Sequence, residues 1–214
     1  MRIVVLVSGT GSNLQAVIDA VKAGELPVEI AAVGADREGT YGVERSAAAG
    51  IPTFVVDFKA YPDRADWNAA LTEAVAAYKP DVVVSSGFMR IVSPSFIDAF
   101  NGRYLNTHPA LLPAFPGAHG VRDAMAYGVK VTGCTVHWAD AGVDTGPIIA
   151  QEAVAIQDAD TEESLHERIK VVERRLLVST LAALAADPSF SPPPSSQAGP
   201  PDTPHPSPLP PPTR

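Results

Sequence analysis

Ile3-Val4-Val5-Leu6-Val7-Ser8-Gly9-Thr10-Gly11-Ser12-Asn13 is the stretch that decides the fold, and a helical pattern from Leu14 to Lys22 follows it. The run from Ile3 to Val7 is entirely aliphatic, which is typical of a strand buried on both faces of a parallel sheet. Glycines between such a strand and a helix let the backbone approach an anion, which the free amides at the helix start attract. The stretch therefore predicts an α/β unit with a candidate phosphate site at Gly11, Ser12 and Asn13. An ordinary glycine-rich turn is the alternative.

This loop departs from the two common nucleotide-binding motifs. A dinucleotide site would have a third glycine where this chain has Leu14, and the chain lacks the Gly-Lys-Ser/Thr of a nucleoside-triphosphate loop. A single phosphate is therefore the ligand that the loop favours. An NAD(P)-dependent oxidoreductase, with Asp36 and Arg37 near a ribose, is a rival interpretation that Leu14 disfavours.

Strands and helices alternate along the next part of the chain. We expect strands at 28–34, 53–56, 81–85 and 103–107, and helices at 43–49 and 63–78. Such alternation implies right-handed βαβ units, which form a mainly parallel open sheet with helices on both faces.

The rhythm changes after residue 107. Two strand patterns, at 129–138 and 146–155, could pair antiparallel at one end of the sheet. A long C-terminal helix is expected at about 161–186, with Asp160 as its N-cap and Glu163 as the capping-box partner. Together these patterns predict a single α/β domain over residues 1–187.

Composition excludes several classes of protein. The chain has 214 residues, a net charge of −8 and one cysteine, Cys134. The acidic balance argues against nucleic-acid binding by bulk electrostatics, and a single cysteine allows no disulfide within the chain and suggests no metal cluster. The apolar run at the N-terminus is too short to span a membrane and lacks the layout of a signal peptide. We therefore expect a cytoplasmic protein.

Residues 188–214 have a different composition from the rest of the chain. They hold twelve of the 21 prolines, many serines and almost no charge. Such a segment buries too little apolar surface to offset its ordering entropy, so a disordered tail is predicted, with a proline-rich docking site as the alternative.

Deleting residues 189–214 should leave both the melting temperature and the turnover unchanged. Loss of either would show that the tail packs on the domain.

The strand at 103–107 carries a pair of polar side chains at its end. Side chains two residues apart on a strand point the same way, so Asn106 and His108 project together while Thr107 turns away. An amide beside an imidazole can stabilise a developing oxyanion and move a proton. The alternative is that Asn106 satisfies the turn and His108 is a surface residue.

A loop acid could complete this pair. Asp144 lies in the glycine-flanked sequence Gly142-Val143-Asp144-Thr145-Gly146. If this loop returns to His108, the carboxylate would favour the protonated imidazole and could shuttle a proton. A solvated loop carboxylate is the alternative. His137, on the strand at 129–138, is expected to be structural or to support a catalytic residue rather than to be catalytic itself.

The last helix contains an acid in an unusual position. By helical spacing, Glu173 falls within the apolar arc that includes Ile169 and Leu177. A carboxylate there is costly unless it has a partner, so it could bind an amine or hydroxyls of a ligand. The alternative is a glutamate at the edge of the arc whose carboxylate reaches water or pairs with Arg174. Lys170, one turn earlier, could help to bind an anion.

In combination, these features resemble the phosphoribosylglycinamide formyltransferases, in their monofunctional bacterial form. The resemblance covers residues 1 to about 186, and the residues that carry it are Val7-Ser8-Gly9-Thr10-Gly11-Ser12-Asn13-Leu14-Gln15, Gly87-Phe88-Met89-Arg90-Ile91, Leu105-Asn106-Thr107-His108-Pro109-Ala110-Leu111-Leu112-Pro113, Pro116-Gly117-Ala118-His119-Gly120 and Asp140-Ala141-Gly142-Val143-Asp144-Thr145-Gly146-Pro147-Ile148. It implies a Rossmann-like domain and a cis peptide bond before Pro113.

The resemblance also implies a role for each group of candidate residues. The implied catalytic residues are Asn106, His108 and Asp144. Those implied to bind glycinamide ribonucleotide are Gly11, Ser12, Asn13, Lys170, Val171, Val172 and Glu173. Those implied to bind the folate are Arg64, Met89, Arg90, Ile91, Val92, Asn106, Asp140, Ala141, Gly142, Val143 and Asp144.

The implied reaction is formyl transfer in purine biosynthesis. The amine of glycinamide ribonucleotide would attack the formyl carbon of 10-formyltetrahydrofolate, with Asn106 and protonated His108 holding the oxyanion. The products would be formylglycinamide ribonucleotide and tetrahydrofolate. No metal, nucleic acid or membrane is expected to take part, and the chain is expected to be a monomer or a homodimer.

Three rivals remain besides the oxidoreductase. A methionyl-tRNA formyltransferase would carry a further C-terminal RNA-binding domain and a basic surface, whereas this chain is acidic. A formyltetrahydrofolate deformylase would carry an extra N-terminal regulatory domain, whereas the first strand here begins at Ile3. A binding module without catalysis would bind phosphate but transfer no formyl group.

Overall fold

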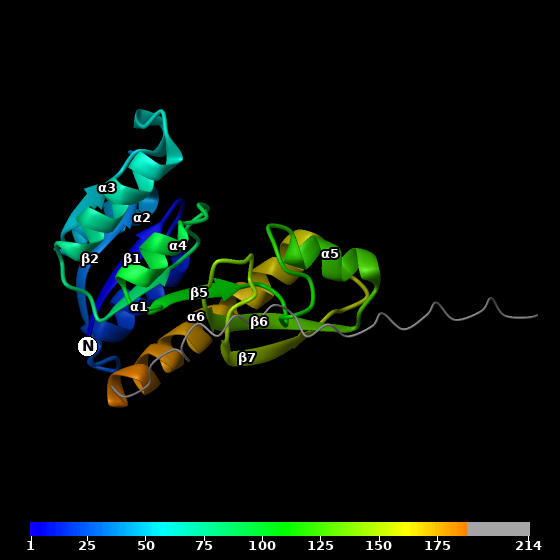
Figure 1. The fold of residues 1–214 in the computed structure, drawn as a ribbon. Coiled ribbons are helices and arrows are strands. Elements are labelled where there is room, and N and C mark those ends of the chain that lie inside the picture. The colour runs from blue at the N-terminus through cyan, green and yellow to red at the C-terminus, as the bar shows by residue number, and fades with distance from the viewer. Residues whose placement is uncertain (188–214) are drawn as a thin grey trace, which may run out of the picture.

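The fold is a seven-stranded sheet covered by helices on both faces (Figure 1), seen in a computed structural model that describes residues 1–187. The predicted tail at 188–214 lies outside these residues. The strands follow the order β3-β2-β1-β4-β5-β6-β7 across the sheet. Their bounds are β1 Arg2–Val7, β2 Glu29–Ala35, β3 Thr53–Val55, β4 Val82–Ser85, β5 Tyr104–His108, β6 Val131–Trp138 and β7 Ile148–Ala155.

Strand direction confirms the predicted architecture. The five strands from β3 to β5 pair in parallel, whereas β5 pairs antiparallel with β6, and β6 with β7. The antiparallel end extends away from the parallel part in Figure 1. Each predicted strand and helix is present, with its ends within two residues of the expected positions.

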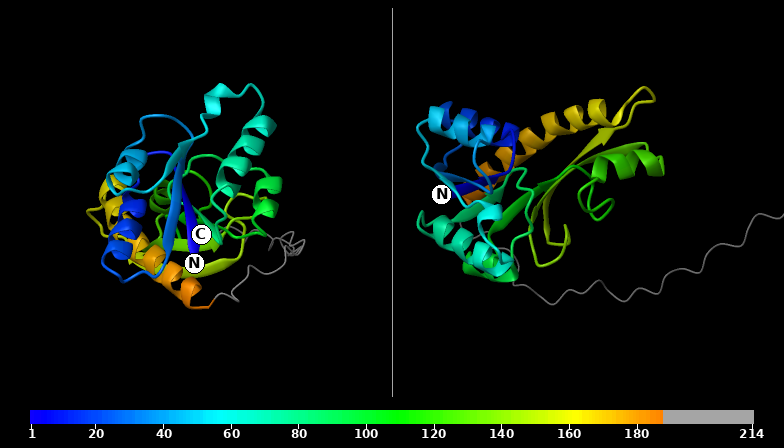
Figure 2. Two further views of the ribbon diagram at one scale, coloured as in Figure 1. Left: turned by 90° about the vertical axis from the view of Figure 1, so that its left-hand side faces the viewer. Right: turned by 90° about the horizontal axis from the view of Figure 1, so that it is seen from above.

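The helices form two layers around the sheet. Their bounds are α1 Ser12–Lys22, α2 Tyr41–Ala48, α3 Arg64–Ala76, α4 Pro94–Ala99, α5 Gly120–Tyr127 and α6 Glu162–Ala186, with a 3₁₀ turn η1 at Phe58–Ala60. Apolar residues of α1, α2, α5 and α6 join the core on one face, and those of α3 and α4 join the core on the other. Figure 2 shows the sheet between these layers.

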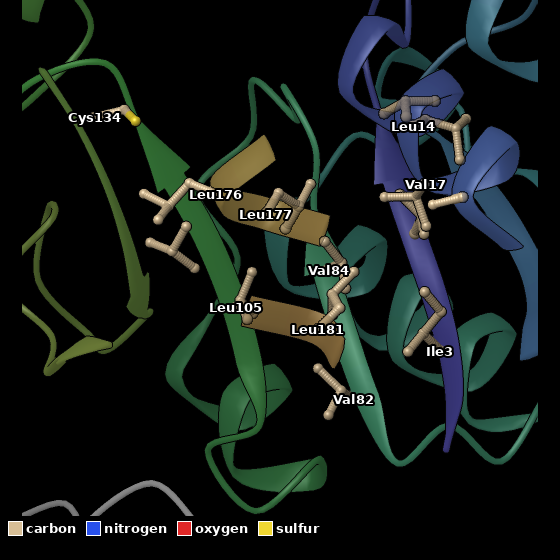
Figure 3. Packing of buried hydrophobic residues seen from close by; sticks show 14 of the residues in the cluster. Ile3, Leu14, Val17, Val82, Val84, Leu105, Cys134, Leu176, Leu177 and Leu181 are labelled. Carbon is tan, nitrogen blue, oxygen red and sulfur yellow. The ribbon is translucent and has the colours of Figure 1, made fainter. Parts of the chain in front are cut away.

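The central strand β1 is apolar because both of its faces are covered. Ile3, Val5 and Val7 join the core under α1 and α6, while Val4 and Leu6 face α3 and α4. Figure 3 shows the first of these cores, in which leucines of α6 lie against β4 and β5. Full burial of one such side chain stabilises the fold by about 1.5–3 kcal/mol.

Two short helices and one helix cap differ from the sequence-based expectation. Helices α4 and α5 were not predicted, although Ser93, whose hydroxyl accepts from the Phe96 amide, followed by Pro94 is a helix-start signal. The predicted N-cap of α6 at Asp160 is wrong. Thr161 is the N-cap, and it forms a reciprocal capping box with Ser164 rather than Glu163. The Asp160 carboxylate accepts from the Gln157 amide and pairs with Arg168, so α6 begins one residue later.

Two further expectations concern the backbone and the membrane. The peptide bond between Leu112 and Pro113 is cis, as the resemblance implied. Among the helices of residues 1–187, none is long and apolar enough to cross a membrane.

Gly11→Ala should destabilise the protein, since this glycine has a left-handed backbone (φ +65°) and its added Cβ would lie 2.8 Å from the Gly42 Cα. A left-handed alanine costs about 1–2 kcal/mol, and the contact with rigid backbone adds to it. Urea unfolding should therefore show a loss of at least about 2 kcal/mol. Gly9→Ala is the matched control, because its Cβ would meet nothing within 4 Å. Equal effects at both positions would contradict this account of the loop.

Candidate active site

A cleft of about 660 Å³ lies at the carboxyl ends of β1, β4 and β5. In the sheet, β2 and β3 follow on one side of β1, whereas β5, β6 and β7 follow on the other side of β4. The strand order therefore reverses between β1 and β4, and ligands of open α/β sheets bind at the carboxyl ends of such a pair. The loops after these three strands line the cleft together with part of α6 and the β6–β7 loop. One site therefore contains most of the polar residues that the sequence singled out.

Asp144 connects the predicted catalytic residues. One carboxylate oxygen lies 3.3 Å from His108 Nδ1 and accepts from the Gly117 amide at 2.8 Å. The other accepts from Asn106 Nδ2 at 3.4 Å. The predicted return of the Asp144 loop to the end of β5 is thus present.

Both nitrogens of the His108 ring face hydrogen-bond acceptors. Nε2 lies 2.8 Å from the carbonyl oxygen of Phe115, and Nδ1 faces the Asp144 carboxylate. A carbonyl and a carboxylate can only accept, so an imidazolium with two N–H groups satisfies both neighbours. The His108 side chain is 5% exposed, which strengthens these interactions by excluding water.

The environment of Asp144 favours its charged form. Burial alone would raise the pKa of this carboxyl group. The His137 imidazole 3.6 Å away, the hydrogen bond from the Gly117 amide and the His108 imidazole together outweigh burial and hold the pKa of Asp144 below its usual value. Asp144 is therefore an ionised acceptor at neutral pH.

The β6–β7 loop is built to present this carboxylate. Asp144 itself has a left-handed backbone (φ +56°), and Asp140 accepts hydrogen bonds from the Gly142 amide and the Thr145 hydroxyl. A Cβ on Gly142 would lie 2.0 Å from the Thr145 hydroxyl oxygen, so only glycine fits this turn. The sequence Asp140-Ala141-Gly142-Val143-Asp144 thus folds tightly, and all of these residues except Ala141 line the cleft.

His137 is a member of this cluster that was expected to be structural or supporting, and it lies beside Asn106 and Asp144. It pairs with Asn106 in the β5–β6 register, and its Nε2 lies 3.3 Å from Asn106 Nδ2. Its Nδ1 faces the Trp138 carbonyl at 3.0 Å and must therefore donate, which leaves Nε2 to accept from the Asn106 amide. Strand register is the signal that could have placed His137 beside Asn106, and sequence patterns alone do not define it.

The glycine loop forms the wall beside α1. Gly11 is the N-cap of α1, and no side chain caps this helix start. The carboxamide oxygen of Asn13 is buried without a hydrogen-bond partner among residues 1–187. Gly11, Ser12 and Asn13 all line the cleft, so free amides and the positive end of the α1 dipole face it.

Helix α6 forms the wall beside the glycine loop. Glu173 and Lys170 line the cleft, whereas the other two expected residues do not: Val171 is exposed and Val172 packs against the core. Glu173 is 6% exposed and forms no hydrogen bond or ion pair within residues 1–187, so the alternative pairing with Arg174 is not present. Its negative charge, after burial, helps to raise the pKa of Cys134 to about 12.

The expected folate residues after β4 are only partly gathered at the cleft. Met89, Arg90, Ile91 and Val92 line it, but Arg64 does not. The Arg64 guanidinium instead donates to the Ile91 carbonyl at 2.5 Å, which ties α3 to this segment. Arg90 pairs with Asp36 at 2.6 Å and stacks over the Phe58 ring, so its charge is already neutralised.

This fold and cluster match a known class of enzyme. The formyl transferase family matches residues 1–181, and the chain belongs to that family. It is 60% identical to the phosphoribosylglycinamide formyltransferase of Mycobacterium tuberculosis H37Rv over 184 residues. The aligned region covers 86% of this chain and 85% of that protein. Within the family, the chain therefore belongs to the phosphoribosylglycinamide formyltransferases.

Solved structures agree with this placement. Glycinamide ribonucleotide transformylase 1 from Symbiobacterium toebii is similar with a TM-score of 0.85 and 46% identity, covering 87% of this chain and 88% of that one. Phosphoribosylglycinamide formyltransferase from Bacillus halodurans is similar with a TM-score of 0.84 and 43% identity, covering 88% and 97% of the two chains.

Proposed function

We propose that this enzyme transfers the formyl group of 10-formyltetrahydrofolate to the amine of glycinamide ribonucleotide, a step of purine biosynthesis. A folate-type formyl donor follows from membership of the formyl transferase family. The observation that carries the proposal is the contact of Asp144 with both His108 and Asn106 in the same cleft as the glycine loop. A phosphate site and a proton-transfer site in one cleft are what this reaction requires.

The proposed chemistry begins with attack of the substrate amine on the formyl carbon. The carbonyl oxygen becomes an oxyanion, which protonated His108 and the Asn106 amide stabilise. In the structure, the two N–H groups of that amide face His137 and Asp144 at 3.3 and 3.4 Å. These are long contacts, so one N–H can turn to the oxyanion at little cost.

Collapse of the tetrahedral intermediate then requires proton transfer. The attacking amine loses a proton, the bond between the formyl carbon and the folate nitrogen breaks, and that nitrogen gains a proton. His108 supplies this proton as a general acid, and Asp144 stabilises the charged imidazole and accepts protons during the cycle. Metal-free chemistry stays a prediction, although residues 1–187 contain no group of three potential His, Cys, Asp or Glu ligands.

The two substrates would occupy opposite parts of the cleft. The amides of Gly11, Ser12 and Asn13 would hold the ribonucleotide phosphate, with Lys170 adding positive charge. Residues 89–92 and the β6–β7 loop would contact the folate, and Arg64 would act only through the Ile91 carbonyl. This arrangement brings the amine toward His108 from one side and the formyl group from the other.

One assay tests the proposed function directly. Purified protein is mixed with glycinamide ribonucleotide and 10-formyltetrahydrofolate, folate absorbance is followed, and the ribonucleotide is analysed by mass spectrometry for the added formyl group. Transfer supports the proposal. Ribonucleotide binding without transfer would favour a binding module, and quenching of nicotinamide fluorescence would favour the oxidoreductase. A cytoplasmic location, a monomer or homodimer, and the lack of nucleic-acid partners stay predictions.

Glu173→Leu should raise stability and weaken ribonucleotide binding together. The carboxylate has no partner within residues 1–187 but lines the open cleft, so replacing it should raise the free energy of unfolding by only about 1 kcal/mol. The lost charge should raise KM for the ribonucleotide by at least about tenfold, with KM for the folate unchanged.

Glu163→Leu is the matched control for that substitution, since Glu163 is exposed on the same helix. It should raise neither stability nor KM. A change confined to the folate KM in Glu173→Leu would show that Glu173 lies beside the other substrate.

A further inference from the structure

His166 is a residue of the cleft to which the proposed reaction assigns no role. It lies on α6 four residues before Lys170 and seven before Glu173, so the three side chains share one face of the helix. All three line the cleft, and so does the glycine loop at residues 9–13.

The imidazole of His166 is available to a ligand. It is half-buried and forms no hydrogen bond or ion pair with another side chain or backbone group of residues 1–187. Within residues 1–187, the charged groups that shift the pKa of His166 are Lys170, Glu173, Glu167 and Glu162, and these lie on α6. Residues 9–13 contribute amides and hydroxyls but no titratable side chain. An anion bound between this loop and α6 would therefore meet donors from both elements.

The free enzyme keeps this imidazole neutral near neutral pH. Burial first, and then the positive charge of Lys170, lower the pKa of His166, while the surrounding carboxylates oppose these effects. A bound dianion would reverse the balance, because a negative charge beside an imidazole favours its protonated form.

We propose that His166 binds the phosphate of the ribonucleotide substrate and takes up a proton when that phosphate enters the cleft. The proposal rests on the proposed function, since it assumes that the phosphate lies against the glycine loop. One nitrogen of the ring donates to a phosphate oxygen, and the proton comes from bulk solvent through the buffer. No covalent bond changes.

Proton uptake gives this contact a pH dependence of defined sign. Between the lowered pKa of the free enzyme and the raised pKa of the complex, binding consumes a proton, so affinity falls as pH rises. The substrate phosphate and amine titrate as well, but they do so equally in every variant. The difference between wild type and a variant at position 166 therefore isolates the histidine.

His166→Gln and His166→Lys test the proposal in the full-length enzyme. Glutamine retains a hydrogen-bond donor without a charge, so KM for the ribonucleotide should rise by about tenfold while kcat stays within about twofold. Lysine retains the positive charge but stays protonated near neutral pH, so KM should return to within about threefold of wild type. Glu163→Gln, exposed on the same helix, should leave both constants unchanged.

Isothermal titration calorimetry supplies the second readout. Ribonucleotide binding measured near neutral pH in two buffers of different ionisation enthalpy should show proton uptake in wild type and less of it in both variants. A KM unchanged by His166→Gln, or equal proton uptake in wild type and variants, would overturn the role of His166. Absence of formyl transfer by wild type would instead overturn the proposed function, so the two failures are distinguishable.

Discussion

His108→Ala should lower kcat by at least about a hundredfold, in the range measured for loss of one oxyanion donor. The ring is the only group that faces both the Asp144 carboxylate, at 3.3 Å, and the Phe115 carbonyl, at 2.8 Å, among the contacts of residues 1–187. Alanine removes the acid that protonates the folate nitrogen and takes away the donor to the Phe115 carbonyl, while Asp144 keeps its hydrogen bonds from Gly117 and Asn106. Steady-state kinetics with both substrates measures the effect.

Binding separates a catalytic loss from a folding defect in this variant. Within residues 1–187, the hydrogen bonds and ion pairs of His108 go to Asp144 and Phe115 and not to the glycine loop or α6, so affinity for the ribonucleotide should stay within about threefold, as for sites that act independently. Calorimetric titration with that substrate measures it, and circular dichroism checks the fold. A kcat within about tenfold of wild type would show that His108 is not the general acid.

The sequence predicted the parts of the site that local patterns define. The strand from Ile3 and its glycine loop follow from consecutive residues, and Asn106 and His108 share a face because strand side chains alternate. The 3.6-residue period of the last helix places the charge of Glu173 among apolar positions, and Glu173 is buried in the structure. Each of these inferences needs only residues close together in the chain.

Other parts of the site depend on contacts between segments that are distant in sequence. His137 lies beside Asn106 only through the register of β5 and β6, and the Gly117 amide reaches Asp144 across 27 positions. Neither contact leaves a local pattern. Arg64 was expected in the folate pocket, yet its guanidinium is used by the Ile91 carbonyl, a backbone group that no sequence pattern identifies as an acceptor.

The cap of α6 shows how close alternatives are decided. Asp160 and Thr161 are adjacent, and both residue types are good N-caps. The Arg168 side chain and the Gln157 amide occupy the Asp160 carboxylate, so Thr161 becomes the cap. Only the folded arrangement of the β7–α6 connection shows which residue remains available.

Asp144→Asn should lower kcat by about a hundredfold or more, while the loop keeps its shape. Asparagine retains an oxygen that accepts from the Gly117 amide, but it lacks the charge that faces His108. The neutral amide neither favours the protonated form of His108 nor accepts a proton. His108 therefore no longer acts as the general acid, although its ring and that of His137 remain in place. Steady-state kinetics should therefore show a fall in kcat with a small change in either KM.

The charge of Asp144 should also be visible in the pH dependence of stability. Its pKa is lowered in the folded protein, because the donors around the carboxylate outweigh burial, so the unfolded chain binds the proton more tightly. The charged form therefore stabilises the fold above the unfolded pKa of about 3.9, and this contribution is lost as pH falls through the lower folded pKa.

The melting temperature of wild type should exceed that of Asp144→Asn near neutral pH, and the difference should shrink below about pH 4. Asp123→Asn, which replaces a partly exposed acid on α5 that pairs with Arg122, should show no kinetic effect and a smaller thermal effect than Asp144→Asn. A difference between wild type and Asp144→Asn that stays constant down to about pH 2 would show that the carboxylate charge does not stabilise this cluster.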